Sequence, residues 1–270
     1  MHKLKVGIIG CGTIGGALGK WIKAKFKKMA VVAYLCDHHE EKAYSLKKKL
    51  GRTIRVVSLR ELIRKADLII EAASASVSRE VVEFGLKHHK MLLIMSVGGL
   101  LDSDRWFKLA CESRGRVWIP SGAIAGVDGI SAARNTKIRR VKLITKKPPL
   151  GLMGAPYFQK KCFPRLHGKR EVCVFRGSAL DAVKAFPQNV NVAAILSLAG
   201  IGPRRTEVEI WTSLRYRVNE HEIYVEGDSG KIRTVTSNAP SPENAKTSYL
   251  AILSAVAVLK KIFSSIEIGT

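Results

Sequence analysis

Three glycines near the N-terminus stand between an apolar run and a helical pattern. The stretch KVGIIGCGTIGGALG carries Gly10, Gly12 and Gly15 as a G-x-G-x-x-G motif. Glycines at this spacing allow a tight turn and let a helix N-terminus approach a pyrophosphate. The motif alone is a weak signal, but its position after a strand and before a helix is typical of a dinucleotide-binding unit. The chain is therefore expected to begin with a Rossmann fold.

An acidic residue follows at the distance that such a unit requires. Asp37 ends the next apolar run, AVVAYLCD, about 20 positions beyond the motif, where a carboxylate accepts hydrogen bonds from the adenosine ribose. This favours NAD as the cofactor. His38 and His39 can tolerate a 2′-phosphate, so NADP stays open.

Small residues come at the ends of two later strands. The stretches EAAS, residues 71–74, and SVGGL, residues 96–100, follow the fourth and fifth predicted strands. Ligands of open parallel sheets bind at this edge, although ordinary turns also use small residues. The predicted cofactor-binding residues are Gly10, Gly12, Thr13, Ile14, Gly15, Asp37, Ala73 and Ser74.

The order of predicted strands and helices changes after Pro120. Strand and helix patterns alternate over residues 1–120, which predicts a parallel sheet with helices on both faces. Over residues 121–245, strand patterns follow one another and are interrupted by a single predicted helix, residues 189–198. The predicted fold class is α/β, with an N-terminal Rossmann domain and a C-terminal α+β domain whose sheet is mainly antiparallel. Residues 246–270 are expected to form a helix that packs back on the first domain.

The net charge of +24 raises the possibility of a nucleic-acid partner. The basic residues, however, are spread along the chain with few aromatic residues between them as stacking platforms. Solvated faces of a basic protein are the preferred interpretation, and nucleic acid is not the expected partner. A positive field also attracts small anions such as carboxylates.

Two cellular expectations follow from composition. No apolar run approaches the roughly 20 residues of a membrane span, and the sequence enters a strand pattern without a signal peptide, so a soluble, cytoplasmic protein without a membrane partner is expected. The five cysteines are widely spaced without a C-x-x-C pair, which suggests neither a disulfide framework nor a metal site.

His221 is the best-placed histidine for chemistry. In VNEHEIYVEG it shares a strand face with Ile223 and Val225. A histidine on an apolar face is usually a packed core residue, but the other histidines lie in terminal, loop or helix-surface contexts. His221 is therefore the candidate for proton transfer near neutral pH.

Two further segments are candidates for ligand contact. The segment IPSGAIAGVDGI, residues 119–130, places small residues, among them Ser121 and Gly122, at the junction of the two predicted domains. It is either a simple hinge or a hinge that lines a substrate cleft. Asn189 and Asn191 stand at the start of an apolar helix, where they either cap it or present their amides to a bound molecule.

These stretches together resemble the L-aspartate dehydrogenase family of archaea and some bacteria. The resemblance runs from about Lys5 to Leu259 and is weakest over residues 151–170. PSGAIAG and NVNVAA are not expected in generic Rossmann enzymes. The matching blocks are GIIGCGTIGGALG, DLIIEAAS, SVGGLLD, PSGAIAGVDGI, FPQNVNVAAILSLAG, VNEHEI and PSPENAKTSYLAILSAVAVL.

The resemblance implies NAD(P)-dependent oxidation of L-aspartate to iminosuccinate, which water converts to oxaloacetate and ammonia, and the reverse reductive amination. It implies that His221 is catalytic and that Ala123 and Asn189 contact the dinucleotide, with Asn191 capping the helix or reaching the substrate. It also implies a homodimer.

Two other classes of function stay open. One is a related dehydrogenase or reductase of aspartate-derived substrates, such as homoserine dehydrogenase or dihydrodipicolinate reductase, whose substrate motifs are not recognisable here. The other is a non-catalytic protein that senses dinucleotides or binds nucleic acid, which the charge suggests.

Overall fold

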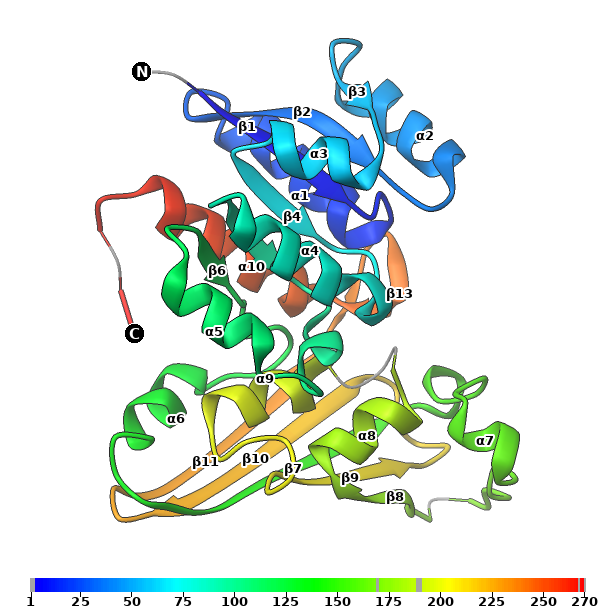
Figure 1. The fold of residues 1–270 in the computed structure, drawn as a ribbon. Coiled ribbons are helices and arrows are strands. Elements are labelled where there is room, and N and C mark those ends of the chain that lie inside the picture. Colours follow the sequence, from blue (N-terminus) through cyan, green and yellow to red (C-terminus); the bar gives the residue numbers. More distant parts are fainter. Residues whose placement is uncertain (1–2, 169, 188–190, 267, 270) are drawn as a thin grey trace. The chain divides into compact units, whose positions relative to one another are not determined.

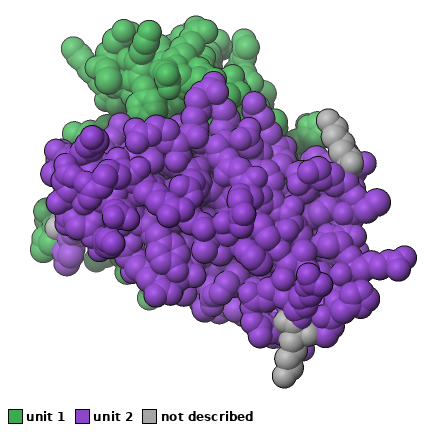
Figure 2. Space-filling model, turned by 90° about the horizontal axis from the view of Figure 1, so that it is seen from below, with its two compact units in different colours: residues 1–120, 252–266 green, residues 121–251, 267–270 purple. Residues whose placement is uncertain are grey.

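The computed structural model describes residues 3–168, 170–187, 191–266, 268 and 269. The chain forms two compact units (Figure 1, Figure 2). Unit 1 comprises Met1–Pro120 and Ile252–Ile266, and unit 2 comprises Ser121–Ala251 and Glu267–Thr270. The polypeptide therefore leaves unit 1, builds unit 2 and then returns.

Unit 1 is built on a six-stranded parallel sheet of order β3-β2-β1-β4-β5-β6. Its strands are β1 (Leu4–Ile9), β2 (Ala30–Cys36), β3 (Arg55–Val56), β4 (Leu68–Glu71), β5 (Met91–Ile94) and β6 (Arg116–Trp118). Because β1 pairs with β2 on one side and β4 on the other, the order reverses at β1, and the carboxyl edge there is where such sheets bind ligands.

Helices cover both faces of this sheet, as the alternation of patterns predicts. The helices are α1 (Thr13–Lys25), α2 (Glu40–Leu50), α3 (Leu59–Lys65), α4 (Ala75–Lys87), α5 (Arg105–Glu112) and the 3₁₀ turn η1 (Val97–Leu100). Helices α1 and α2 contribute to one buried apolar cluster with β1 and β2, whereas α4 contacts α3 and α5 on the other face (Figure 1). The sequence patterns did not indicate α5 and β6, which are short and amphipathic.

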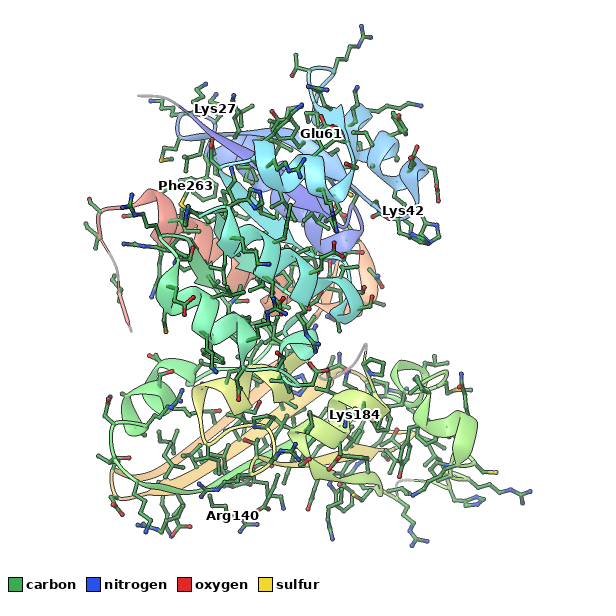
Figure 3. All side chains as sticks on the ribbon, viewed as in Figure 1. Lys27, Lys42, Glu61, Arg140, Lys184 and Phe263 are labelled. Carbon is green, nitrogen blue, oxygen red and sulfur yellow. The ribbon has the colours of Figure 1, made fainter. Side chains whose placement is uncertain are left out.

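The last helix, α10 (Tyr249–Phe263), completes the core of unit 1. Ala255, Val256 and Leu259 lie in the same apolar cluster as β1, and the ring of Phe263 packs 5.2 Å from that of Phe26 (Figure 3). The helix starts later than the expected residue 246.

A hairpin occupies the residues before α10. It consists of β12 (Pro240–Ser241) and β13 (Asn244–Ser248). The prolines at 240 and 242 lack an amide donor and favour a turn over a helix, so the segment SPENAKTS does not form the first turns of the helix.

Unit 2 contains a five-stranded sheet of order β11-β10-β7-β9-β8. Its strands are β7 (Ile138–Lys147), β8 (Val172–Ser178), β9 (Glu207–Thr212), β10 (Asn219–Gly227) and β11 (Gly230–Asn238). Only the β7–β9 pair is parallel, and the other pairs are antiparallel. The predicted fold class, α/β with a mainly antiparallel second sheet, is confirmed.

The helices of unit 2 include more than the one predicted. They are α6 (Val127–Ala133), α7 (Tyr157–Lys160), α8 (Ala179–Ala185), α9 (Asn191–Ala199) and the turn η2 (Pro149–Gly151). Most of them are too short to show a helical period in the sequence. Helices α8 and α9 pack on one another and against β9 and β7 (Figure 1).

We call the sheet face that bears Val141, Leu143, Thr145 and His221 the inner face of unit 2. Alternation buries Val141, Leu143 and Thr145 along β7 and His221 along β10. Gly200, directly after α9, lies against the side chain of Val141. Figure 2 views unit 2 from the opposite side, which we call its outer face.

Candidate functional site

The glycine turn joins β1 to α1. Gly10 has a φ of +90°, which favours glycine, and a Cβ at this position would lie 2.5 Å from the backbone of Ala72. A Cβ at Gly15 would lie 2.0 Å from the carbonyl oxygen of Gly10. Gly12, in contrast, faces open space, with no atom within 4 Å of an added Cβ among the residues that the structure describes. Protein packing therefore explains two glycines, and the third leaves room for a ligand.

The structure places Asp37 against this turn. Its Oδ2 accepts a hydrogen bond of 2.6 Å from the backbone N–H of Cys11, and its Oδ1 accepts one of 2.9 Å from that of His39. The predicted acid is therefore anchored to the glycine motif. Thr13 and Ile14, two further predicted residues, are the first residues of α1.

Cys11, inside the motif, is a packing residue. Burial, together with the nearby charge of Asp37, raises the pKa of its thiol to about 12. Because only the thiolate is a good nucleophile, the thiol is inert at neutral pH.

Glu71 connects the two small-residue loops and was not predicted as a functional residue. This buried carboxylate ends β4 and accepts hydrogen bonds from the backbone N–H groups of Ala73 (2.8 Å) and Ser96 (3.0 Å). Burial raises its pKa. Ala73 also adjoins Gly10, since a Cβ on that glycine would lie 2.6 Å from the Ala73 nitrogen.

The cofactor-site residues predicted in unit 1 therefore converge at the carboxyl edge of β1 and β4. Ser74 follows Ala73 at the start of α4, and its hydroxyl lies 2.8 Å from that of Ser76. A single Glu in the stretch EAAS carried no visible signal, because burial and backbone partners are not apparent in a sequence.

His221 lies on the inner face of unit 2 and is 3% exposed. It pairs with Thr145 of β7 on one side and Thr236 of β11 on the other, and its Nδ1 lies 3.1 Å from Thr145 Oγ1. Burial, and then the positive charge of Lys147, lower its pKa to about 3. The ring is therefore neutral at physiological pH and in the form that accepts a proton.

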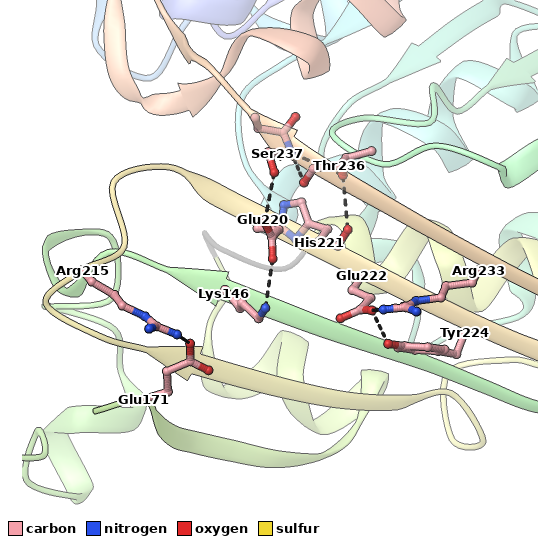
Figure 4. A network of polar contacts seen from close by, with 11 residues as sticks. Lys146, Glu171, Arg215, Glu220, His221, Glu222, Tyr224, Arg233, Thr236 and Ser237 are labelled. Carbon is pink, nitrogen blue, oxygen red and sulfur yellow. Dashed lines mark hydrogen bonds and ion pairs between the residues drawn. The ribbon is translucent and has the colours of Figure 1, made fainter. Parts of the chain in front are cut away.

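The segment around Ala123 is tied to the strand beside His221. The Ala123 carbonyl oxygen accepts hydrogen bonds of 3.0 Å from both Thr236 Oγ1 and Asn238 Nδ2. Thr236 Oγ1 also lies 3.5 Å from the His221 carbonyl oxygen (Figure 4). Thr236 therefore links Ala123 to His221, although these two residues lie about a hundred positions apart in the sequence.

The other predicted residues of unit 2 lie around this segment. Gly122 has a φ of +66° and a Cβ there would lie 3.0 Å from Ile195 of α9. Asn191 is the first residue of that helix, and Ser121 is half-buried just before Gly122. Asn189 falls outside the described residues.

Three polar residues of the inner face were missed by the sequence analysis. They are Thr145, Lys147 and Asn238, all buried. Oδ1 of Asn238 has no hydrogen-bond partner within the described part of the chain. A signal existed for two of them, since Thr145 and Lys147 continue the alternation of Val141 and Leu143, but a lysine is unremarkable among 46 basic residues.

The outer face carries a separate polar network. Lys146 Nζ donates to Glu220 (3.0 Å), and Arg233 donates to Glu222 (Figure 4). Because strand side chains alternate between faces, these pairs do not approach the ring of His221.

The described residues contain no group of three or more His, Cys, Asp or Glu side chains that could hold a metal ion. None of their helices is long and apolar enough to cross a bilayer. The exposed Lys27 lies in the turn after α1, Lys42 on α2 and Lys184 on α8 (Figure 3), in keeping with dispersed charge.

A Rossmann unit with an anchored acid at its glycine turn, together with an α+β unit that buries a neutral histidine, defines an NAD(P)-binding oxidoreductase. Residues 10–116 match the family model described as homoserine dehydrogenase, NAD binding domain, and residues 128–262 match the one described as aspartate dehydrogenase, C-terminal. The chain belongs to the aspartate dehydrogenase family.

Individual relatives agree with this assignment along the whole chain. An L-aspartate dehydrogenase of Methanosarcina acetivorans is 46% identical over 99% of this chain and 100% of its own length. L-aspartate dehydrogenase 3 of Bordetella bronchiseptica is 35% identical over 100% of this chain and 98% of its own. The crystal structure of aspartate dehydrogenase from Thermotoga maritima is similar with a TM-score of 0.76 and 25% identity, covering 99% of this chain and 100% of that one.

Proposed function

We propose that this protein catalyses the NAD(P)-dependent oxidation of L-aspartate to iminosuccinate, which water hydrolyses to oxaloacetate and ammonia, and that the reaction is reversible. The observation that carries the proposal is the buried, neutral His221, held by Thr145, in a chain of the aspartate dehydrogenase family.

The residues of unit 1 fit a nicotinamide dinucleotide. The open space at Gly12 accommodates a pyrophosphate at the start of α1, and Asp37 is anchored where it can accept from ribose hydroxyls. A bound nicotinamide supplies the hydride acceptor. We assign the dinucleotide contacts to the predicted set in unit 1 with Ala123 and Asn189, and propose NAD as the preferred form because Asp37 would repel a 2′-phosphate.

The acid–base step belongs to His221. If Nδ1 carries the ring hydrogen and donates it to Thr145, Nε2 accepts the proton of the substrate ammonium, so that the amine is neutral when hydride leaves the α-carbon. Once this proton has been released to solvent, the neutral Nε2 accepts a proton from the water that attacks the imine in the hydrolytic step. The carboxylates of a bound substrate raise the pKa of the ring, which opposes the effect of burial. We place Ser121, Gly122 and Asn191 at the substrate.

The substrate assignment is tested with a panel of compounds. L-Aspartate, D-aspartate, L-glutamate and L-homoserine are each supplied with NAD and with NADP, and reduced cofactor is followed by absorbance. Turnover confined to L-aspartate supports the proposal. Turnover of homoserine instead would overturn it, and the match of residues 10–116 to the homoserine dehydrogenase NAD-binding domain makes this compound the necessary competitor.

We also propose that the protein is a homodimer located in the cytoplasm, where nicotinamide dinucleotides and amino acids are both available. The outer face of unit 2 supports the dimer. Acidic and basic residues, such as Glu207 and Arg140, alternate on this face. Val235, which is 52% exposed, adds an apolar contact. A twofold axis makes such a surface self-complementary.

Light scattering tests this assembly. The wild type should give twice the chain mass of 29.7 kDa, and Val235→Asp should shift the mass towards the monomer. A monomeric wild type at micromolar concentration would refute the dimer.

A further inference from the structure

Lys147 is a buried cation at the end of β7. Its side chain continues the inner face after Val141, Leu143 and Thr145, and the residue is only 7% exposed. Burial lowers the pKa of its ammonium to about 8, which leaves it protonated at neutral pH.

The register places this ammonium beside His221. Thr145 is the direct partner of His221, and Lys147 is two residues further along the same face, which makes it a diagonal neighbour within reach of a long side chain. The charge of Lys147 contributes to the lowered pKa of His221, so the two groups interact.

The strand backbone holds Lys147 firmly. Its main chain pairs with Thr212 of β9, whose Oγ1 donates a hydrogen bond of 2.9 Å to the Lys147 carbonyl oxygen. Thr212 therefore fixes the backbone at Lys147, whereas Thr145 contacts the ring of His221 itself.

Charge is divided between the two faces of this sheet. On the outer face, Glu207, Glu220 and Glu226 lie opposite Lys142, Lys146 and Arg140 in the register. Glu209 and Glu222 lie on the same face, opposite Ile144. The inner face of β7, β9 and β10 bears Lys147 and His221 among apolar and hydroxyl side chains. This face is therefore electropositive beside the proposed catalytic histidine and suits an anion.

We propose that Lys147 binds one carboxylate of the substrate and thereby makes the site selective for four-carbon dicarboxylates over monocarboxylates. This inference rests on the proposed function, because His221 must act at the amino-bearing carbon of the same molecule. The ammonium supplies the cationic partner that a substrate with two carboxylates requires, and a water-excluded location strengthens their attraction.

Binding of two non-reacting compounds tests this role without turnover. Succinate and butyrate have the same number of carbons and differ by one carboxylate, and each is titrated by calorimetry into the NAD-loaded protein at pH 7. Wild type should bind succinate at least 100-fold more tightly. Lys147→Met should weaken succinate about 100-fold and leave butyrate within about threefold, because only the dicarboxylate uses the ammonium.

The control is Lys137→Met, which makes the same change at an exposed lysine just before β7. It should leave both affinities unchanged. In turnover, Lys147→Met should raise the KM for L-aspartate about 100-fold with a smaller loss of kcat, unlike a change of the proton-transfer residue.

Several results would overturn the inference. Succinate and butyrate affinities that fall equally in Lys147→Met would mean that Lys147 only shapes the site, and an unchanged preference for succinate would mean that another group binds the carboxylate. Replacing a buried charge with an apolar side chain of similar length should not unfold the protein. If Lys147→Met and Lys147→Gln both failed to fold, Lys147 would be a structural residue.

The proposed function can fail separately. Suppose that the wild type prefers succinate, that this preference depends on Lys147, and that the protein does not oxidise L-aspartate. This result would support the dicarboxylate site and contradict the proposed reaction.

Discussion

Thr145 and His221 face each other across the β7–β10 pair, and Thr145 Oγ1 lies 3.1 Å from His221 Nδ1. Both residues are buried. This contact fixes the plane of the ring and engages one nitrogen, so the other nitrogen is available for proton exchange with a substrate.

Loss of the imidazole should damage chemistry while sparing cofactor binding. General acid–base catalysis typically contributes about 10²–10⁴-fold to the rate, so His221→Ala should lower kcat by that range with NAD affinity retained. His221→Asn keeps similar size and polarity but does not titrate, and it should be almost as inactive. Steady-state kinetics and NAD titration measure both effects. An Asn variant with most of the wild-type kcat would make His221 a packing residue.

Removing the hydroxyl of Thr145 should misorient the ring. Thr145→Val keeps the shape and loses one hydrogen bond worth about 1 kcal/mol, so kcat should fall roughly fivefold. Thr145→Ser, which restores the hydroxyl, should recover most of this loss. Equal defects in both variants would show that packing at this position, and not the hydrogen bond, determines the rate.

The buried histidine should make the fold sensitive to acid. Its pKa is about 3 in the folded protein and about 6.5 when unfolded, so between these values only the unfolded chain binds the proton. The free energy of unfolding should therefore be unaffected by this group above pH 6.5 and fall by about 1.4 kcal/mol per pH unit below it. Urea denaturation from pH 7 to 5 measures the slope. His221→Asn should show a shallower slope, and identical slopes would contradict the assignment.

Asp37 should determine the choice of cofactor. Asp37→Ala removes an acceptor for the ribose hydroxyls and a negative charge that disfavours a 2′-phosphate, so NAD should bind roughly tenfold or more weakly while NADP loses little. Fluorescence titration with both reduced cofactors measures the ratio. Since Asp37 also accepts from Cys11, an equal loss for both would mean that its role is to shape the turn.

Glu71 should support cofactor binding from beneath the loops. In Glu71→Gln an amide N–H₂ replaces one acceptor that now faces the backbone N–H of Ala73 or Ser96. Such a loss costs about 1–3 kcal/mol of stability and should weaken NAD several-fold. Glu80→Gln, on an exposed acid of α4, is the matched control for thermal melting and NAD titration. Wild-type NAD affinity in Glu71→Gln would exclude this role.

The sequence predicted those features that depend on local pattern. The glycine turn and the position of Asp37 follow from spacing within one strand–turn–helix unit, and the pairing of His221 with an apolar face follows from alternation along a single strand. The contacts that organise the site are not local. Thr145 reaches His221, and Asn238 reaches Ala123, only because strands far apart in sequence pair in one register.

The role of Lys147 could not be predicted from the sequence for a related reason. Lys146 and Lys147 are adjacent and chemically identical, yet one pairs with Glu220 on the outer face and the other is buried beside a histidine. The distinction depends on which face of β7 is covered by helices, and this cannot be read from the lysines themselves. Likewise, the apolar run of α10 predicted a longer helix, but Pro240 and Pro242 favour the hairpin that precedes it.

The return of the chain into unit 1 has a consequence for synthesis. Ala255, Val256 and Leu259 complete the apolar cluster around β1, but they are made only after every residue of the intervening sheet. Domains usually fold in order from the N-terminus during translation. Here, part of the apolar core of the dinucleotide-binding unit stays exposed until unit 2 has left the ribosome. The ability to bind a nicotinamide dinucleotide should thus appear only after α10 has been synthesised.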